Sequence, residues 1–175
     1  IGQENYMLGT VEILEGLDGE DYIAFPDPEL CQPGAATTHD APVPEETEGV
    51  FEDLLFKDSK KNKSFVVTRE RKGVKKAKLS YRVLESKKDG ENVKTVVEVY
   101  LYTGRSHQIR VQFSHRRMPL MGDRRYGSGK DNCNIALWSY RLKFVSPFDN
   151  EENSYSSVPD TETFPWCLFD KSLFL

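Results

Sequence analysis

The sequence is poor in three features: long apolar runs, cysteine, and basic residues near the N-terminus. No stretch of about eighteen consecutive apolar residues occurs, which excludes an ordinary membrane-spanning helix. The acidic N-terminal residues lack the basic flank of a signal peptide, so we expect a soluble, cytoplasmic protein. The three cysteines, Cys31, Cys133 and Cys167, are spaced for neither a disulfide framework nor a zinc site. We therefore expect reduced thiols and no structural metal.

Acidic and basic residues are segregated along the chain. Residues 1–56 contain 14 acidic and no basic side chains, whereas residues 57–88 contain 13 basic and three acidic ones. The chain stays basic to residue 148 and is acidic after it. A basic centre of this kind can bind an anionic partner although the formal net charge is −4. The alternative is that the Lys-rich stretch is simply solvated surface.

The hydrophobic pattern predicts one domain with a long hairpin. A chain of 175 residues with 38% hydrophobic residues suits a single globular domain. Two alternating segments, residues 77–86 and 94–102, flank Asp89-Gly90, which is a strong hairpin signal. Residues 135–145 predict a last strand. The acidic tail should be turn-rich until the aromatic cluster at 164–169, which should pack back onto the body.

The predicted hairpin leads directly into a corner. Thr103-Gly104 breaks the second strand, and Ser106 is the expected N-cap of a helix over residues 107–118. Ile109 and Phe113 would lie on one face of that helix.

Several hydrogen-bond donors meet at this corner: Arg105, His107, Gln108 and Arg110. Such donors, with the backbone N–H groups of a helix start, form an anion or carboxylate site. Arginine suits the role better than lysine because its planar fork can hold a carboxylate by two bonds. The alternative is structural: Arg105 lies on the surface, His107 is a satisfied polar group, and Arg110 makes an ordinary ion pair.

The string TGRSHQIRV at residues 103–111, followed by PLMGD at 119–123 and by Tyr126-Gly127, resembles the signature of the RluA family of RNA pseudouridine synthases. The resemblance extends over residues 49–147. It implies an α+β fold with a mixed, mainly antiparallel central sheet and flanking helices. Residues 1–175 would then form a single, partial catalytic domain that lacks its N-terminal part, with residues 31–48 as a loop or insertion.

The resemblance also implies an activity. The family isomerises uridine in RNA, here rRNA or tRNA, to pseudouridine without cofactor or metal: the base is flipped out, its glycosidic bond is cleaved, and the ring is reattached through carbon. In the family a Tyr stacks on the uracil, and an Arg pairs with the carboxylate of an essential Asp. The Arg corresponds to Arg110. The stacking residue is best matched by Tyr22, with Tyr6 as the weaker match.

RNA contact is also expected from basic residues on both sides of the motif. Lys72, Lys75, Lys76 and Lys78 precede it, and Arg116, Arg117, Arg124 and Arg125 follow it. Three residues at the C-terminal end of the predicted helix fit either a favourable interaction with the helix dipole or phosphate contact: His115, Arg116 and Arg117. The residues expected to touch RNA or line the pocket are therefore Arg105, His107, Gln108, Arg116 and Arg117.

One family motif is missing. The essential Asp lies in a His-Arg-Leu-Asp motif that does not occur in these residues, and His39-Asp40 lacks its flanking pattern. Asp123 is then an alternative partner for Arg110. Because Ile1 is not an initiator residue, we expect a processed product or a piece of a longer protein. Three interpretations remain: a synthase seen without its catalytic loop, a non-catalytic RNA-binding relative that keeps the basic cleft, and a domain in which the motif only builds the corner.

Overall fold

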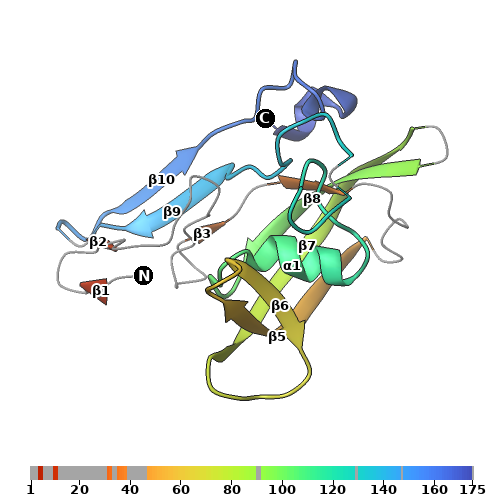
Figure 1. Cartoon of the computed structure of the whole chain (residues 1–175). Helices are drawn as coiled ribbons and strands as arrows, with labels where there is room; N and C mark the ends of the chain where they lie inside the picture. Colours follow the sequence, from red (N-terminus) through yellow and green to blue (C-terminus); the bar gives the residue numbers. More distant parts are fainter. Residues whose placement is uncertain are drawn as a thin grey trace.

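The computed structural model describes residues 4–5, 10–11, 31–32, 35–38, 47–89, 92–128, 130–146 and 148–174 (Figure 1). Its main sheet has the strand order β4–β8–β7–β5–β6, and every neighbouring pair is antiparallel. The predicted α+β class with a mainly antiparallel sheet is therefore confirmed. The strands are β4 (Ala35–Thr38), β5 (Glu48–Asp58), β6 (Lys63–Val67), β7 (Val74–Asp89) and β8 (Asn92–Leu101).

Strands β7 and β8 form the long hairpin that the alternating pattern predicts. Their register runs from Leu79 opposite Leu101 to Asp89 opposite Asn92, with a bulge between Val83 and Glu85. Successive side chains of a strand point to opposite faces, so the alternation gives the sheet one apolar face, where Leu79 and Val99 are buried.

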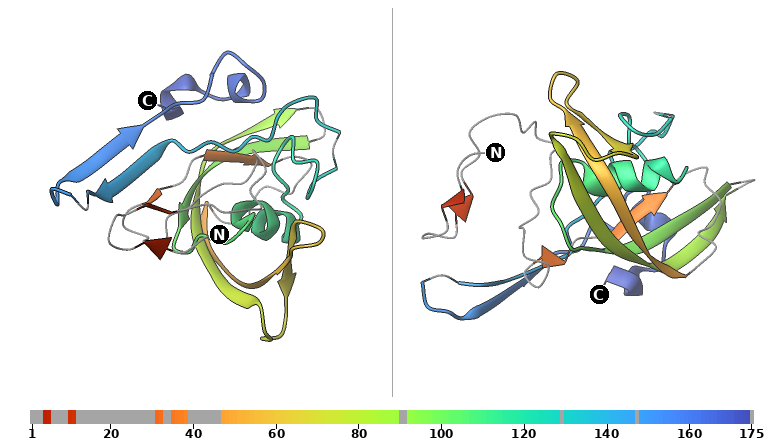
Figure 2. Two further views of the ribbon diagram at one scale, coloured as in Figure 1. Left: turned by 60° about the vertical axis from the view of Figure 1, so that its left-hand side comes forward. Right: turned by 90° about the horizontal axis from the view of Figure 1, so that it is seen from below.

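Helix α1 (Gln108–His115) covers this apolar face. Ile109 and Phe113 pack into the cluster that contains Leu79 and Leu101, as the spacing of four residues predicts. Burial of side chains of this size contributes about 1.5–3 kcal/mol each. Figure 2 shows α1 lying across β7 and β5, which fixes the helix relative to the sheet.

The start of α1 differs from the prediction. The N-cap residue is His107, whose φ of 55° lies in the left-handed region, and no side chain caps the helix. The hydroxyl of Ser64 donates a 2.7 Å hydrogen bond to the backbone carbonyl of Ser106. The predicted Ser106 cap is therefore wrong, because the helix begins one residue later and without a side-chain cap.

The predicted loop at residues 31–48 also needs correction, because it contains two short strands. Strand β3 (Cys31–Gln32) pairs with β9 (Arg141–Val145), and β4 pairs with β8. The free edges of β8 and β9 offer unpaired backbone groups, which short extended segments can satisfy regardless of composition. Glu48, the last residue of the predicted loop, already belongs to β5.

The C-terminal region adds a second hairpin. β9 pairs with β10 (Glu152–Ser156), which the turn-rich tail did not predict. In Figure 2 this hairpin projects beyond the five-stranded sheet. The predicted return of the aromatic cluster is confirmed, since Trp166 and Phe169 pack against Val96.

The remaining elements are small. β1 (Glu4–Asn5) pairs with β2 (Thr10–Val11), and two short 3-10 helices, η1 (Trp166–Leu168) and η2 (Lys171–Phe174), end the described chain. None of the described helices has the length and apolar character needed to cross a membrane.

Candidate active site

The centre of the site is a buried ion pair between α1 and the loop that follows it. Nε of Arg110 lies 3.0 Å from Oδ2 of Asp123, and Nη2 lies 2.9 Å from Oδ1. The exposed fractions of the two side chains are 5% and 0%. Arg110 follows Ile109, so it points about 100° around the helix from the side chain that packs on the sheet. The partner of Arg110 in this structure is therefore Asp123, the alternative that the sequence left open.

The Asp123 carboxylate is held on its other side by backbone groups. Oδ1 accepts hydrogen bonds of 3.0 Å from the N–H groups of Arg125 and Tyr126. Burial raises the pKa of Asp123, but the hydrogen bonds and charge of Arg110 and the two backbone donors outweigh it, so the pKa lies below its usual value. Asp123 is a carboxylate at neutral pH.

Tyr126 ties the loop to the rest of the site. Its hydroxyl accepts a 2.7 Å hydrogen bond from the backbone N–H of Ser64 and lies 2.9 Å from Nδ1 of His107. Its ring lies under the guanidinium of Arg110, 5.3 Å from centroid to Cζ. Burial raises the pKa of Tyr126, so the hydroxyl keeps its proton. Tyr126 thus connects β6, α1 and the Asp123 loop.

A pocket of about 540 Å³ opens beside Arg110. Burial, with the charge of Asp131, raises the pKa of the Cys133 thiol above its usual value, which favours the protonated form at neutral pH. Three arginines make the pocket suited to carboxylate or phosphate groups. Within the part of the chain that the structure describes, no cluster of His, Cys, Asp or Glu could hold a metal ion. The lining residues are Arg110, Gly122, Arg124, Arg125, Cys133, Asn134 and Ile135.

Comparison with known proteins shows which family the chain belongs to. The family model described as RNA pseudouridylate synthase matches residues 21–115, more than half of the chain. The chain belongs to this family.

Two curated relatives agree with this pseudouridine synthase assignment. tRNA pseudouridine synthase C of Vibrio parahaemolyticus is 38% identical over 76 residues, which cover 38% of this chain and 31% of the relative. Ribosomal large subunit pseudouridine synthase D of Neisseria meningitidis is 36% identical over 78 residues, covering 37% and 21%. The predicted resemblance to the RluA family is confirmed.

The solved structure shows the shared fold. Human RNA pseudouridylate synthase domain containing 1 superposes with a TM-score of 0.60 at 20% sequence identity, over 77% of this chain and 57% of that one. The matched regions span less than a third of each of the two curated relatives and 57% of the solved chain.

Within the pseudouridine synthase motif, the structure assigns His107 and Gln108 to internal bonds rather than to a ligand surface. Both are buried. The amide oxygen of Gln108 accepts from the hydroxyl of Thr103 and the N–H of Arg105, and its amide nitrogen donates to the carbonyl of Lys78. His107 faces Tyr126. These two residues build the corner, because each polar group at the turn needs a buried partner.

The other predicted contact residues are dispersed. Nε of Arg105 donates to the carbonyl of Lys76. Arg116 forms a two-bond ion pair with Asp53, at 2.8 and 3.2 Å. Its partner in this structure is therefore a carboxylate of β5. Burial raises the pKa of Asp53, but bonds from Arg116 and Gln112 lower it below its usual value. Arg117 is exposed.

Some site predictions fall outside the described residues, and some contacts were not predicted. Tyr22, Tyr6 and His39-Asp40 lie outside the described residues. Ser64 was not singled out, and Tyr126 was noted only as part of the signature. No pattern within residues 57–88 links Ser64 to a tyrosine 62 positions later.

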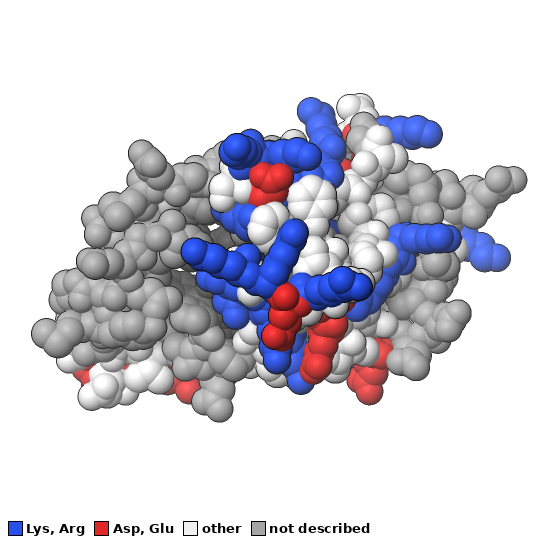
Figure 3. All heavy atoms as spheres, turned by 60° about the horizontal axis from the view of Figure 1, so that its bottom comes forward, with Lys and Arg blue, Asp and Glu red and all other residues white. Residues whose placement is uncertain are grey.

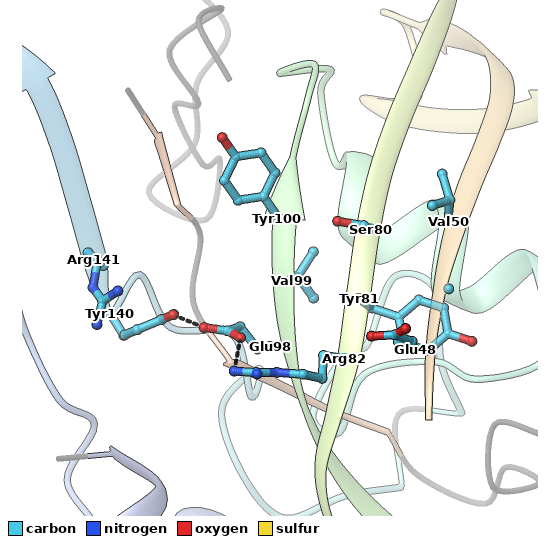
Figure 4. A pocket seen from close by; sticks show the side chains of 11 residues that line it. Glu48, Val50, Ser80, Tyr81, Arg82, Glu98, Val99, Tyr100, Tyr140 and Arg141 are labelled. Carbon is cyan, nitrogen blue, oxygen red and sulfur yellow. Dashed lines mark hydrogen bonds and ion pairs between the residues drawn. The ribbon is translucent and has the colours of Figure 1, made fainter. Parts of the chain in front are cut away.

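A second pocket, of about 660 Å³, lies on the sheet face opposite α1 (Figure 4). There Glu98 accepts a 2.7 Å bond from Arg82 and a short hydrogen bond from the hydroxyl of Tyr140. Burial, with the bond to Glu98, raises the pKa of Tyr140 to about 12. No residue of the pseudouridine synthase motif lines this pocket.

Proposed function

We propose that the protein is an RNA pseudouridine synthase of the RluA type that converts uridine to pseudouridine in rRNA or tRNA. The observation that carries this proposal is Arg110, the motif arginine, held rigidly at the wall of a pocket with two further arginines. The names of the two relatives, one a tRNA pseudouridine synthase and one a large ribosomal subunit pseudouridine synthase, support an RNA substrate.

The proposed reaction needs no oxidant or reductant. The bond from C1′ to N1 of uracil breaks, a bond from C1′ to C5 forms, the proton at C5 leaves, and N1 takes up a proton. In this proposal Arg110 orients the carboxylate of the catalytic Asp, which the His-Arg-Leu-Asp segment of a longer chain would supply. Tyr22 would stack on the uracil. Arg124 and Arg125 would contact phosphate groups at the pocket.

A basic surface continuous with the pocket supports RNA contact. Figure 3 shows Lys and Arg side chains gathered at the end of the molecule that carries the β5–β6 turn and the β6–β7 loop. This end touches the pocket, because Nη1 of Arg125 donates to the carbonyl of Asn62 and Nζ of Lys63 donates to the carbonyl of Arg125. The exposed basic residues of this region are Lys60, Lys61, Arg69, Arg71, Lys72, Lys75, Lys76 and Lys78.

The test is tritium release from rRNA and tRNA transcripts whose uridine carries tritium at C5, since pseudouridine formation releases the hydrogen bonded to C5. The complete product of the gene and the 175-residue chain are assayed side by side. If the complete product carries a His-Arg-Leu-Asp segment, we expect release by the complete product and none by the chain. A complete product that carries the segment and releases no tritium from either RNA would overturn the proposal.

One observation favours a second function, RNA binding without catalysis. Arg110 already has a carboxylate partner, Asp123, within the chain. A non-catalytic relative would bind RNA, and each phosphate contact would add about 0.7 to the slope of log affinity against log salt. Salt-sensitive binding by the complete product, together with a sequence that lacks the catalytic Asp motif, would establish this alternative.

A further inference from the structure

The guanidinium of Arg110 is held by one edge. Nε and Nη2 form that edge, and both bond to the carboxylate of Asp123. The ring of Tyr126 lies against one face of the guanidinium. A second carboxylate could approach only the edge formed by the two terminal nitrogens, and Arg110 also lines the pocket.

Asp123 is itself immobilised by the main chain. Two backbone N–H groups of its own loop bond to Oδ1. The preceding residue, Gly122, donates its N–H to Asp131 at 2.8 Å and packs directly on the backbone of Asn134. These contacts fix the position of the Asp123 carboxylate, to which Arg110 is bonded.

We propose that Asp123 is a positioning residue for the isomerisation: it fixes the direction in which Arg110 presents its second edge to the reacting carboxylate. The inference rests on the proposed function. If this is so, Asp123 should affect kcat, because a misplacement of about 1 Å at a reacting group can reduce a rate about 100-fold.

Asp123→Asn separates this role from a role in folding the loop. The asparagine Oδ1 can still accept from Arg125, Tyr126 and Nη2 of Arg110, whereas its amide nitrogen would face Nε of Arg110, donor against donor. The loop contacts survive and the two-bond grip is lost.

The chain offers a matched control on the same helix. Arg116 also lies next to α1 and also forms a two-bond ion pair, with Asp53, but neither residue lines the Arg110 pocket. Asp53→Asn and Asp123→Asn should therefore both lower thermal stability, but only Asp123→Asn should change the geometry of the Arg110 pocket.

The experiment measures kcat and KM for tritium release by the complete gene product and its two variants. We expect Asp123→Asn to lower kcat about 100-fold with KM within about threefold, and Asp53→Asn to leave both within about threefold. A near-normal kcat in Asp123→Asn, or an equal loss in Asp53→Asn, would overturn the inference.

A second readout follows the positioning itself. In the 175-residue chain, the Nε–H proton NMR signal of Arg110 should exchange slowly with water, and should be lost in Asp123→Asn but kept in Asp53→Asn. An unchanged signal in Asp123→Asn would contradict the inference. The proposed function and the positioning role can be refuted separately. An inactive wild-type protein would overturn the proposed function and with it any role of Asp123. An active wild type with an equally active Asp123→Asn variant would overturn only the positioning role.

Discussion

Replacing Gly122 by Ala should destabilise the protein far more than replacing Gly73 by Ala. Both glycines have left-handed backbones, with φ of +72° and +87°. A Cβ in that conformation costs about 1–2 kcal/mol at either position. At Gly73 a Cβ would meet Phe56 at 3.6 Å, an ordinary contact, whereas at Gly122 it would lie 2.3 Å from the carbonyl oxygen of Asn134.

The extra cost at Gly122 comes from two backbones that must separate. Real Cβ atoms essentially never approach another heavy atom closer than 3.0 Å, so the two segments must move apart by about 0.7 Å, the difference between 3.0 and 2.3 Å. Two hydrogen bonds of 2.8 Å join them, from Gly122 to Asp131 and from Ala136 to Met121. Each contributes about 1 kcal/mol. The total loss should be about 3–4 kcal/mol for Gly122→Ala against about 1–2 for Gly73→Ala.

Urea unfolding followed by tryptophan fluorescence measures both losses, since Trp166 is buried. The comparison uses the wild-type chain and the two variants at one temperature and pH. Equal losses at the two glycines would refute the reasoning, because they would show that the contact with Asn134 adds nothing to the backbone strain.

Three further predictions concern the ion pair and its support. Arg110→Lys should abolish most tritium release by the complete protein, because a point charge cannot reproduce two-bond orientation of a carboxylate; near-normal turnover would contradict the assigned role. Tyr126→Phe should lower the free energy of unfolding by about 1–3 kcal/mol in urea titrations, since the N–H of Ser64 loses its buried acceptor; no change would mean that another acceptor replaces the hydroxyl. The pKa of Asp123 is lower in the folded than in the unfolded state, so its stabilisation is full above the unfolded value of about 3.9 and is lost as pH falls through the folded value. The unfolding free energy of the wild type should therefore fall more steeply below pH 4 than that of Asp123→Asn, and parallel curves would show that the carboxylate contributes nothing.

The spacing of apolar residues predicted the central hairpin and the buried face of the helix. The β7–β8 hairpin and the buried face of α1 follow from the alternation and the four-residue spacing of their apolar residues. Strands β3 and β4 were not predicted, because they form by pairing with the edges of β9 and β8. The local sequence of residues 31–38 does not indicate that pairing. The helix start was misplaced because His107 takes a left-handed backbone and becomes the N-cap, which the local pattern does not indicate.

The site was predicted in outline and misread in detail. Arg110 was selected correctly as a carboxylate-binding residue, and Asp123 was noted as its possible partner, because charge and motif position are visible in the sequence. His107 and Gln108 were taken as ligand contacts on the same evidence. Burial does not distinguish them from Arg110, since all three are buried, but their partners do: His107 bonds to Tyr126 and Gln108 to the backbone of β7, whereas Arg110 holds a carboxylate and lines the pocket.

The depth of the Arg110–Asp123 pair itself argues for a role beyond stability. Removing two charges from water costs several kcal/mol per ion, and well-packed apolar residues in the same place often stabilise a protein at least as well. The Arg116–Asp53 pair avoids much of that cost, because its arginine is 28% exposed. Arg110 and Asp123 carry the full desolvation penalty at the wall of the basic pocket, where a fixed guanidinium can direct a reacting group. The pair is therefore expected to orient a reacting group as well as to stabilise the fold, and the kcat values of Asp123→Asn and Asp53→Asn test that role.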